Sequence, residues 1–304
     1  MSASKPLRGL RLKLPATSAN LGPGFDAVGL AMSMHLTVEA HPAAVFQIAT
    51  SGRDPELCAA LENNLIVDTY SLECARHGVE AQPLRLIIHN EIPLGMGCGS
   101  SAAALLAGVA LARHFGGIKM TDAEVVDEAS RIEGHPDNVA ACWHGGFTVS
   151  AQSEAGVECA TFVGNPAWEM MLALPQASLS TKKARALLPV TYSKEDAVFN
   201  VQRAALLVAA FAQGQLDLLR TAMQDRMHQP YREEACPLLE ALLPLASEKE
   251  IAGAALSGAG PSVLVFLSEG TTLLEAETRL RAAAGEEVEL LSLRIAEGVT
   301  QTLL

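Results

Sequence analysis

The fold is indicated most clearly by the stretch Pro93-Leu-Gly-Met-Gly-Cys-Gly-Ser-Ser-Ala-Ala103. In it, three alternate glycines precede two serines and a long apolar segment. The alternating run Leu84–His89 before it predicts a strand. Residues 102–115 after it are apolar on nearly every face, which predicts a buried helix. Glycines at a strand-to-helix junction can turn their N–H groups inward, where the helix N-terminus adds positive potential. The sequence therefore predicts a loop that holds a triphosphate.

This loop differs from the two common nucleotide-binding motifs. It lacks the lysine of G-x-x-x-x-G-K-[ST], and Gly99 comes one residue too early for G-x-G-x-x-G. A tight turn required by helix packing alone is the competing interpretation. Packing alone does not require three glycines followed by two serines, so we favour phosphate binding.

The composition is typical of a globular enzyme with two domains. The chain has 304 residues, 49% of them hydrophobic and 18% charged, which exceeds the length of most single domains. A formal net charge of −12 argues against a nucleic-acid or anionic-membrane partner, because either would need a basic face. The six cysteines are scattered and no apolar signal segment follows the N-terminus, so we expect a reduced, cytoplasmic protein.

The first half of the sequence alternates between strand and helix signals. Residues 11–14 and 32–38 alternate at strand period, and the turn-forming residues Pro15–Asp26 between them predict a loop. Thr121 and Glu124 have the spacing of a capping box, which predicts a helix that ends near Gly134. Residues 135–138 after it are expected to form a turn.

A polar, aperiodic stretch at residues 152–156 marks the expected domain boundary, so we predict domains at 1–153 and 154–304. In the second half, Ser180 and Ser193 can each cap a helix, and Leu216–Met227 predicts another. Two apolar runs flank Ser257–Ser262, which predicts two strands joined by a glycine loop.

Two oxygen-bearing residues are candidates for a Mg²⁺ site beside the phosphates. Ser101 follows the glycine loop, and Glu133 is expected in the last turn of its helix. A carboxylate there opposes the helix dipole by about 0.3–1 kcal/mol, a penalty that a bound cation would reverse. A solvated, structurally neutral Glu133 is the alternative.

Other polar clusters allow both a structural and a functional interpretation. His135, Asp137 and Asn138 share one expected turn and could simply be turn formers. Arg185, in a small basic cluster with two lysines, and Arg232 are suited to bidentate capture of a carboxylate. Ordinary surface charges would give the same pattern.

The glycine-bearing segments together resemble the GHMP kinase superfamily. Pro15–Asp26 looks specifically like the homoserine kinase family, Pro93–Ala103 is similar to the superfamily's phosphate-binding motif, and Leu256–Val263 is similar to its C-terminal glycine motif. The segments Glu133–Asn138, Ser180–Arg185 and His228–Arg232 also look like homoserine kinase segments. Cys98 is a departure, because the family usually has leucine there, and we interpret it as a packing variant.

The resemblance implies an α+β, two-domain GHMP kinase fold. Its N-terminal domain would be ribosomal-protein-S5-like α/β and hold ATP, and its C-terminal domain would be ferredoxin-like α+β and close over the substrate. It also implies a homodimer, by analogy with relatives. The implied reaction transfers the γ-phosphate of ATP to the hydroxyl of L-homoserine, on the route to threonine.

Individual roles follow from the same resemblance. Ser101 and Glu133 would hold Mg²⁺, and with Asn138 they are the expected catalytic residues. The residues expected to contact ATP are Asn64, Pro93, Gly95, Met96, Gly97, Cys98, Gly99, Ser100, Ser101, Ala102 and Ala103. Those expected to contact homoserine are Asn20, Asp26, His135, Asn138, Thr181, Arg185, Arg232 and Gly260. Asp26 would pair with the substrate ammonium and the arginines with its carboxylate.

Two other functions compete with this one. A GHMP kinase for mevalonate or shikimate would also use the arginines, but those substrates lack an ammonium for Asp26. A non-catalytic nucleotide or amino-acid sensor of the same fold would bind ATP without turnover. A loose transition state demands little of a base, so none is assigned, with Asp137 and His135 as the candidates.

Overall fold

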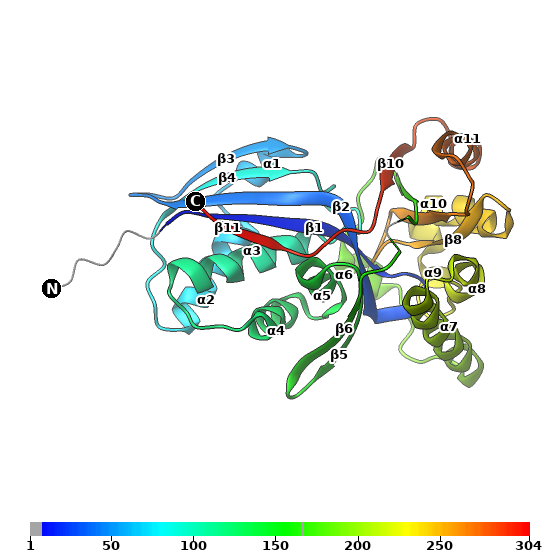
Figure 1. Cartoon of the computed structure of the whole chain (residues 1–304), viewed down its shortest axis with the longest axis horizontal. Helices are drawn as coiled ribbons and strands as arrows, with labels where there is room; N and C mark the ends of the chain where they lie inside the picture. Colours follow the sequence, from blue (N-terminus) through cyan, green and yellow to red (C-terminus); the bar gives the residue numbers. More distant parts are fainter. Residues whose placement is uncertain (1–7, 166) are drawn as a thin grey trace.

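The computed structural model describes residues 8–165 and 167–304, which form two sheets with helices packed against them (Figure 1). Residues 1–7, at the start of the expected first domain, lie outside the described residues. The strands are β1 (Leu10–Asn20), β2 (Gly24–Pro42), β3 (Gln47–Gly52), β4 (Leu84–Asn90), β5 (Phe147–Ser153), β6 (Gly156–Phe162), β7 (Met170–Leu174), β8 (Ile251–Leu256), β9 (Val263–Leu267), β10 (Glu289–Leu293) and β11 (Thr300–Leu303). The α-helices are α1 (Pro55–Ala59), α2 (Leu65–Arg76), α3 (Ser100–Phe115), α4 (Asp122–Glu133), α5 (Asp137–His144), α6 (Thr181–Ala186), α7 (Lys194–Gln213), α8 (Leu219–Ala222), α9 (Gln229–Arg232), α10 (Pro237–Leu242) and α11 (Leu273–Ala284). Short 3₁₀ turns η1 (Leu216–Leu218), η2 (Glu233–Ala235) and η3 (Leu243–Ser247) join the later helices.

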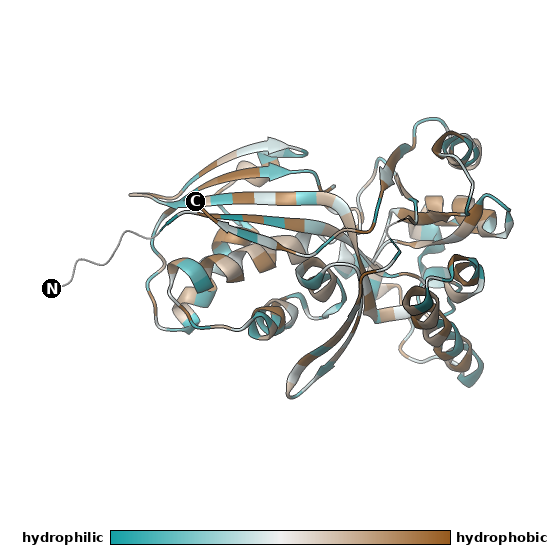
Figure 2. Ribbon diagram, in the orientation of Figure 1, coloured by the Kyte–Doolittle hydropathy of each residue, from teal (hydrophilic) through white to brown (hydrophobic). Residues whose placement is uncertain are grey.

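The larger sheet has the order β11-β1-β2-β4-β3, with the hairpin β5–β6 attached to β2. Strand β1 begins with the expected alternation, since Leu10, Leu12 and Leu14 are buried between exposed residues. The same alternation appears as bands of colour along the strands (Figure 2). Helices α3 and α5 pack on β1 and β2, and α2 and α4 pack on α3. The sheet therefore has one face that is covered by helices.

Helix α3 begins directly after the glycine loop, as predicted. Most of its residues are buried, so the interpretation of the run 102–115 as a buried helix is confirmed. The Thr121–Glu124 capping box is also confirmed, because both reciprocal hydrogen bonds are present. Helix α4 ends at Glu133, and Gly134 follows with a left-handed φ of 90°.

The smaller sheet is antiparallel, in the order β10-β7-β9-β8. One face shares a core with helices α7 and α8, and the other shares a second core with α10 and α11. Phe147 of β5 stacks on Phe211 of α7, with ring centroids 3.9 Å apart. The two sheets are thus joined by a continuous apolar core, and the predicted two-domain α+β class is confirmed.

Three local predictions were wrong. Residues 15–20 continue β1 up to Asn20, so the loop expected from Pro15 to Asp26 shrinks to residues 21–23 before β2. The helix expected over Leu216–Met227 ends at Ala222, because the Asp225 carboxylate accepts hydrogen bonds from the following backbone N–H groups. Of the turn expected at 135–138, residues 135 and 136 are non-helical as predicted, whereas Asp137 and Asn138 begin α5.

The domain boundary after residue 153 stays a prediction. Strand β6 follows that boundary yet pairs with β5 in the larger sheet, and β11 returns to pair with β1. All six cysteines are unpaired. Within residues 8–165 and 167–304, no helix has the length and apolar character needed to cross a membrane.

Candidate active site

The glycine loop between β4 and α3 has the backbone that its sequence predicts. Gly95, Gly97 and Gly99 have φ values of 69°, 73° and 70°. Residues with a Cβ rarely adopt this left-handed region. Gly99 is the N-cap of α3, so the loop opens directly onto the positive end of that helix. The main-chain geometry therefore suits an anion.

Gly97 also packs against the second glycine loop, at residues 257–262. The Ser257 hydroxyl donates to the Gly97 carbonyl oxygen at 2.7 Å. A Cβ on Gly97 would lie only 2.1 Å from the Ser257 carbonyl oxygen, so alanine does not fit here. The two motifs, 160 residues apart in sequence, thus form one structural unit.

Two cavities meet at Ser100 and Ser101. One, of about 260 Å³, is lined by the glycine loop, Glu133, Asn138, Asp26 and both predicted arginines. The other, of about 330 Å³, has mainly apolar walls that include Leu36 and Ile66, with Asn64 at its edge. An apolar cavity suits a nucleobase and a polar one suits a small charged substrate, and phosphates between them would lie at the glycine loop.

Ser101 and Glu133 both line the first cavity and contact each other. The Ser101 hydroxyl donates to Glu133 Oε2 at 2.7 Å, although the residues belong to α3 and α4. Hydroxyl and carboxylate oxygens are ligands that Mg²⁺ prefers, beside phosphate oxygens. The donor set therefore fits Mg²⁺ at the position expected for it.

His135, Asp137 and Asn138 form a buried polar cluster on the same cavity. Asp137 Oδ1 lies 2.6 Å from His135 Nδ1 and accepts from the Asn138 backbone N–H at 2.6 Å. Burial lowers the pKa of His135, but the hydrogen bond and negative charge of Asp137 outweigh it, so the pKa is raised. Asn138 Oδ1 accepts from the Thr17 hydroxyl at 2.7 Å, which orients the amide beside Gly99.

Asp26 and Arg185 form a bidentate ion pair, with N–O distances of 2.5 and 3.0 Å. Both side chains are about one-third exposed toward the cavity. Burial lowers the pKa of Arg185, but the hydrogen bonds and charge of Asp26 outweigh it, so the pKa is raised. Asp26 has a left-handed φ of 56°, which is strained for an aspartate.

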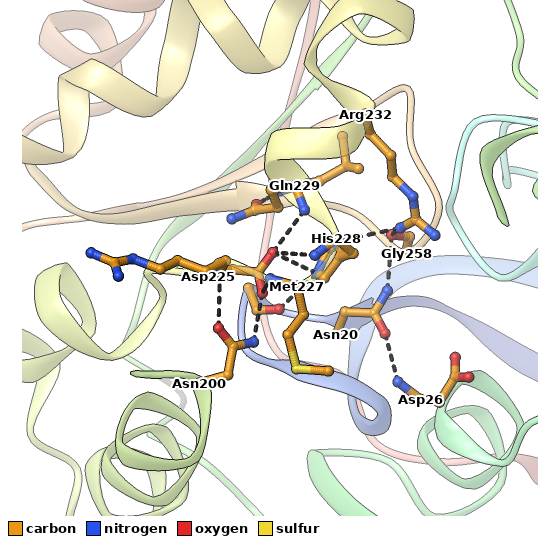
Figure 3. Close-up of polar contacts among 12 residues, drawn as sticks. Asn20, Asp26, Asn200, Asp225, Met227, His228, Gln229, Arg232 and Gly258 are labelled. Atoms are coloured by element: carbon orange, nitrogen blue, oxygen red, sulfur yellow. Dashed lines mark hydrogen bonds and ion pairs between the residues drawn. The ribbon is translucent and has the colours of Figure 1, made fainter. Parts of the chain in front are cut away.

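Arg232 is a buried cation without a carboxylate partner among the described residues. Its side chain is 1% exposed, and it donates to the Ala184 and Gly258 carbonyl oxygens and to His228. None of the ion pairs in residues 8–165 and 167–304 involves Arg232. Burial and the charge of Arg185 lower its pKa. Figure 3 shows Arg232 beside His228 and Gly258.

Comparison with known proteins supports a common origin with kinases. Residues 64–146 match the family described as GHMP kinases N terminal domain, and residues 207–286 match the family described as GHMP kinases C terminal. A homoserine kinase from Solibacter usitatus is 46% identical over 94% of this chain and 95% of its own length. The chain belongs to the homoserine kinase family.

Two further relatives agree with this membership. A homoserine kinase from Deinococcus radiodurans is 42% identical over 86% of each chain. The crystal structure of homoserine kinase from Cytophaga hutchinsonii has a TM-score of 0.80 and covers 99% of this chain and 100% of its own. That structure is 23% identical, so it speaks to the fold. Like its family, the chain is an ATP-dependent kinase that acts on an alcohol group.

The structure brings most of the predicted site residues of this homoserine kinase family member together. The predicted residues among those that line the first cavity are Asn20, Asp26, Gly95, Gly97, Cys98, Gly99, Ser100, Ser101, Glu133, His135, Asn138, Thr181, Arg185 and Arg232. Asn20 is buried, and its amide bonds the Gly258 carbonyl and the Asp26 N–H. Asn64 lines the second cavity and caps α2.

Five predicted residues lie outside the linings of both cavities. Ala102 and Ala103 are fully buried in the core, and Pro93 and Met96 lie in the loop behind the cavity-lining glycines. Gly260 faces Cys236 and Leu256, while its neighbours Gly258 and Ala259 line the first cavity. Their contacts with ligands stay predictions.

Three residues were not assigned a role from the sequence. Thr17 holds Asn138, and the ring of Phe25 lies near both arginines, with its centroid 5.4 Å from Arg185 Cζ and 5.7 Å from Arg232 Cζ. His228 contacts Arg232 and the Gly22 carbonyl. Thr17 and Phe25 lie within the quoted segment Pro15–Asp26, and this segment was the available signal for them.

Proposed function

We propose that the chain transfers the γ-phosphate of ATP to the side-chain hydroxyl of L-homoserine, giving O-phospho-L-homoserine and ADP in threonine biosynthesis. The observation that carries this proposal is the buried Arg232 cation, which lacks a carboxylate partner among the described residues and lines the cavity next to the glycine loop.

The substrate carboxylate pairs with Arg232. A buried cation is costly unless an anion compensates it, and a guanidinium matches a carboxylate through two parallel hydrogen bonds. The present partners of Arg232 are neutral carbonyl and imidazole groups. An anion arriving from the cavity would therefore gain a charge-assisted interaction with Arg232.

The substrate ammonium pairs with Asp26. Each carboxylate oxygen of Asp26 accepts one hydrogen bond from Arg185, which leaves further lone pairs directed at other donors. The ammonium can bind without breaking the Asp26–Arg185 pair. Arg185 then contributes to the substrate carboxylate together with Arg232, because both arginines line the same cavity.

ATP binds with its base in the apolar cavity near Asn64 and its phosphates on the amides of Gly95, Gly97 and Gly99. Ser101 and Glu133 would hold Mg²⁺, which when bound neutralises phosphate charge. Cys98 is a buried residue within this loop. Burial raises the pKa of its thiol to about 12, so the side chain stays neutral and contributes packing.

Alignment of the hydroxyl is the remaining contribution of the protein. Asn138 lies beside Gly99, where the phosphate and substrate sides of the cavity meet, and its amide is fixed by Thr17 and Asp137. A loose phosphoryl-transfer transition state depends on positioning and charge stabilisation. The proposal therefore assigns no side chain as a base.

The test is a coupled ADP-release assay with L-homoserine, mevalonate and shikimate, each with Mg·ATP. We expect turnover with homoserine, because it alone carries an ammonium for Asp26. Turnover with mevalonate or shikimate but not homoserine would overturn the substrate assignment. ATP binding without turnover on any of the three would favour a sensor.

We propose a cytoplasmic location, supported by six unpaired cysteines in the structure, and we propose a homodimer by analogy with relatives. Light scattering coupled to size-exclusion chromatography tests the dimer. A mass near 32.0 kDa across the micromolar range would refute it.

A further inference from the structure

His228 is fully buried behind Arg232, and its two ring nitrogens have different partners. Nε2 lies 2.7 Å from the Gly22 carbonyl oxygen, and Nδ1 lies 3.1 Å from a terminal nitrogen of Arg232. A carbonyl oxygen can only accept a hydrogen bond, so Nε2 must carry a hydrogen. A guanidinium can only donate, so Nδ1 must be unprotonated. The contacts thus select the neutral ring with the hydrogen on Nε2.

The loop before His228 fixes this ring in place. The Asp225 carboxylate accepts from four donors: Asn200 Nδ2 at 2.6 Å and the backbone N–H groups of Met227, His228 and Gln229 at 2.7–2.9 Å. The Gln229 side chain in turn accepts from the Leu256 backbone N–H at 2.7 Å. Figure 3 shows Asp225 at the centre of these contacts, with His228 between it and Arg232.

The surroundings of His228 keep it neutral. Burial is the largest effect and lowers its pKa, the charge of Asp225 raises it, and the charge of Arg232 lowers it. A second proton would fall on Nδ1, against the guanidinium. The geometry and the charges therefore agree on one protonation state.

From this geometry we infer that His228 is a positioning residue for the phosphoryl transfer: its unprotonated Nδ1 holds the Arg232 guanidinium in the orientation that receives the substrate carboxylate. The inference rests on the proposed function, because it needs Arg232 to bind that carboxylate. It assigns to Asp225 the supporting role of ordering the loop that carries His228.

Two near-isosteric substitutions separate the contacts of the two nitrogens. In H228N the amide oxygen can occupy the place of Nδ1 and accept from Arg232, while the bond to Gly22 is lost. In H228Q the amide nitrogen can occupy the place of Nε2 and donate to Gly22, while the acceptor for Arg232 is lost. A purely structural role for the ring would make the two variants equivalent, or H228N the worse.

We expect H228Q to raise the KM for homoserine roughly 10- to 100-fold, the range for losing one hydrogen bond to a charged group. The KM for ATP should change less than about twofold. H228N should keep most of the homoserine affinity. An equal rise in both variants, or a larger rise in H228N, would overturn the inference.

A double variant shows whether His228 acts through Arg232. R232A alone should raise the KM for homoserine, and R232A/H228Q should be no worse, because the positioned group is already gone. Additive losses would overturn the inference. If R232A leaves the KM for homoserine unchanged, the carboxylate assignment of the proposed function fails instead, so the two failures are distinguishable.

A spectroscopic measurement on the unaltered protein covers the case in which a variant does not fold. Long-range ¹H–¹⁵N correlation spectra of histidine-labelled protein at neutral pH should contain a neutral ring with its hydrogen on Nε2. If a variant at His228 folds, the signal missing from its spectrum is that of His228. If no variant folds, segmental ligation that places the labelled histidine at position 228 alone assigns the signal. An imidazolium, or a hydrogen on Nδ1, would overturn the inference.

Discussion

Replacing Gly97 with alanine should damage both stability and ATP use, because its Cβ would enter the contact between the two glycine loops. The new atom would lie 2.1 Å from the Ser257 carbonyl oxygen and 2.9 Å from that of Gly260. Both obstacles are backbone atoms, so one loop has to move. Movement would also lengthen the hydrogen bond from the Ser257 hydroxyl to the Gly97 carbonyl.

The size of the effect follows from two contributions. A left-handed φ of 73° costs a residue with a Cβ about 1–2 kcal/mol, and losing the hydrogen bond costs about 0.5–1.5 kcal/mol. We therefore expect a loss of roughly 1.5–3.5 kcal/mol, before any cost of the loop movement. Gly78→Ala is the matched control, since its φ is 68° but its Cβ would meet nothing within 4 Å.

Thermal unfolding and steady-state kinetics of both variants test this reasoning. At about 2–4 °C per kcal/mol, Gly97→Ala should lower Tm by roughly 3–14 °C and Gly78→Ala by clearly less. Only Gly97→Ala should raise the KM for ATP, because only it displaces the amides of the phosphate loop. Equal Tm losses with unchanged ATP kinetics would refute the described contact.

Three further predictions concern other parts of the chain. Ser101→Ala should lower kcat/KM for Mg·ATP by roughly 10-fold or more with little change in the KM for homoserine; unchanged kinetics over a Mg²⁺ titration would contradict its role as a ligand. Burial raises the pKa of Cys98 from its ordinary 9.0 to about 12, so the folded state keeps a proton that the unfolded thiol loses in this range. Stability should therefore fall as pH rises from 9 to 12, and Cys98→Ala should flatten the slope of Tm against pH; an identical slope would contradict this. Thr121→Ala removes the α4 capping box and should cost about 1 kcal/mol of stability at unchanged kcat, whereas a variant with unaltered Tm would show that the cap is dispensable.

Features that depend on nearby residues could be predicted from the sequence. The phosphate loop, helix α3 and the α4 capping box each follow from residues within a few positions of one another. The position of Glu133 at the end of α4 follows in the same way from Gly134. Such signals are local because helix caps and glycine turns satisfy their own backbone.

Features that join distant segments could not be predicted. Asp26 and Arg185 are 159 residues apart, and nothing in either segment indicates that they pair with each other before any substrate arrives. The early end of the helix at Ala222 depends on Asp225, whose carboxylate satisfies three backbone N–H groups and so competes with the helix. Apolar spacing over residues 216–227 gave no sign of that competition.

The partnership of β11 with β1 has a consequence for how the chain is made. Leu10–Lys13 pair with Thr300–Leu303, so β1 in the larger sheet receives its second neighbour from a segment that is translated long after it. Until those residues emerge from the ribosome, β1 presents an open edge with unpaired N–H and C=O groups. A nascent chain stalled before residue 300 should therefore be more prone to strand-mediated association than a chain that includes β11.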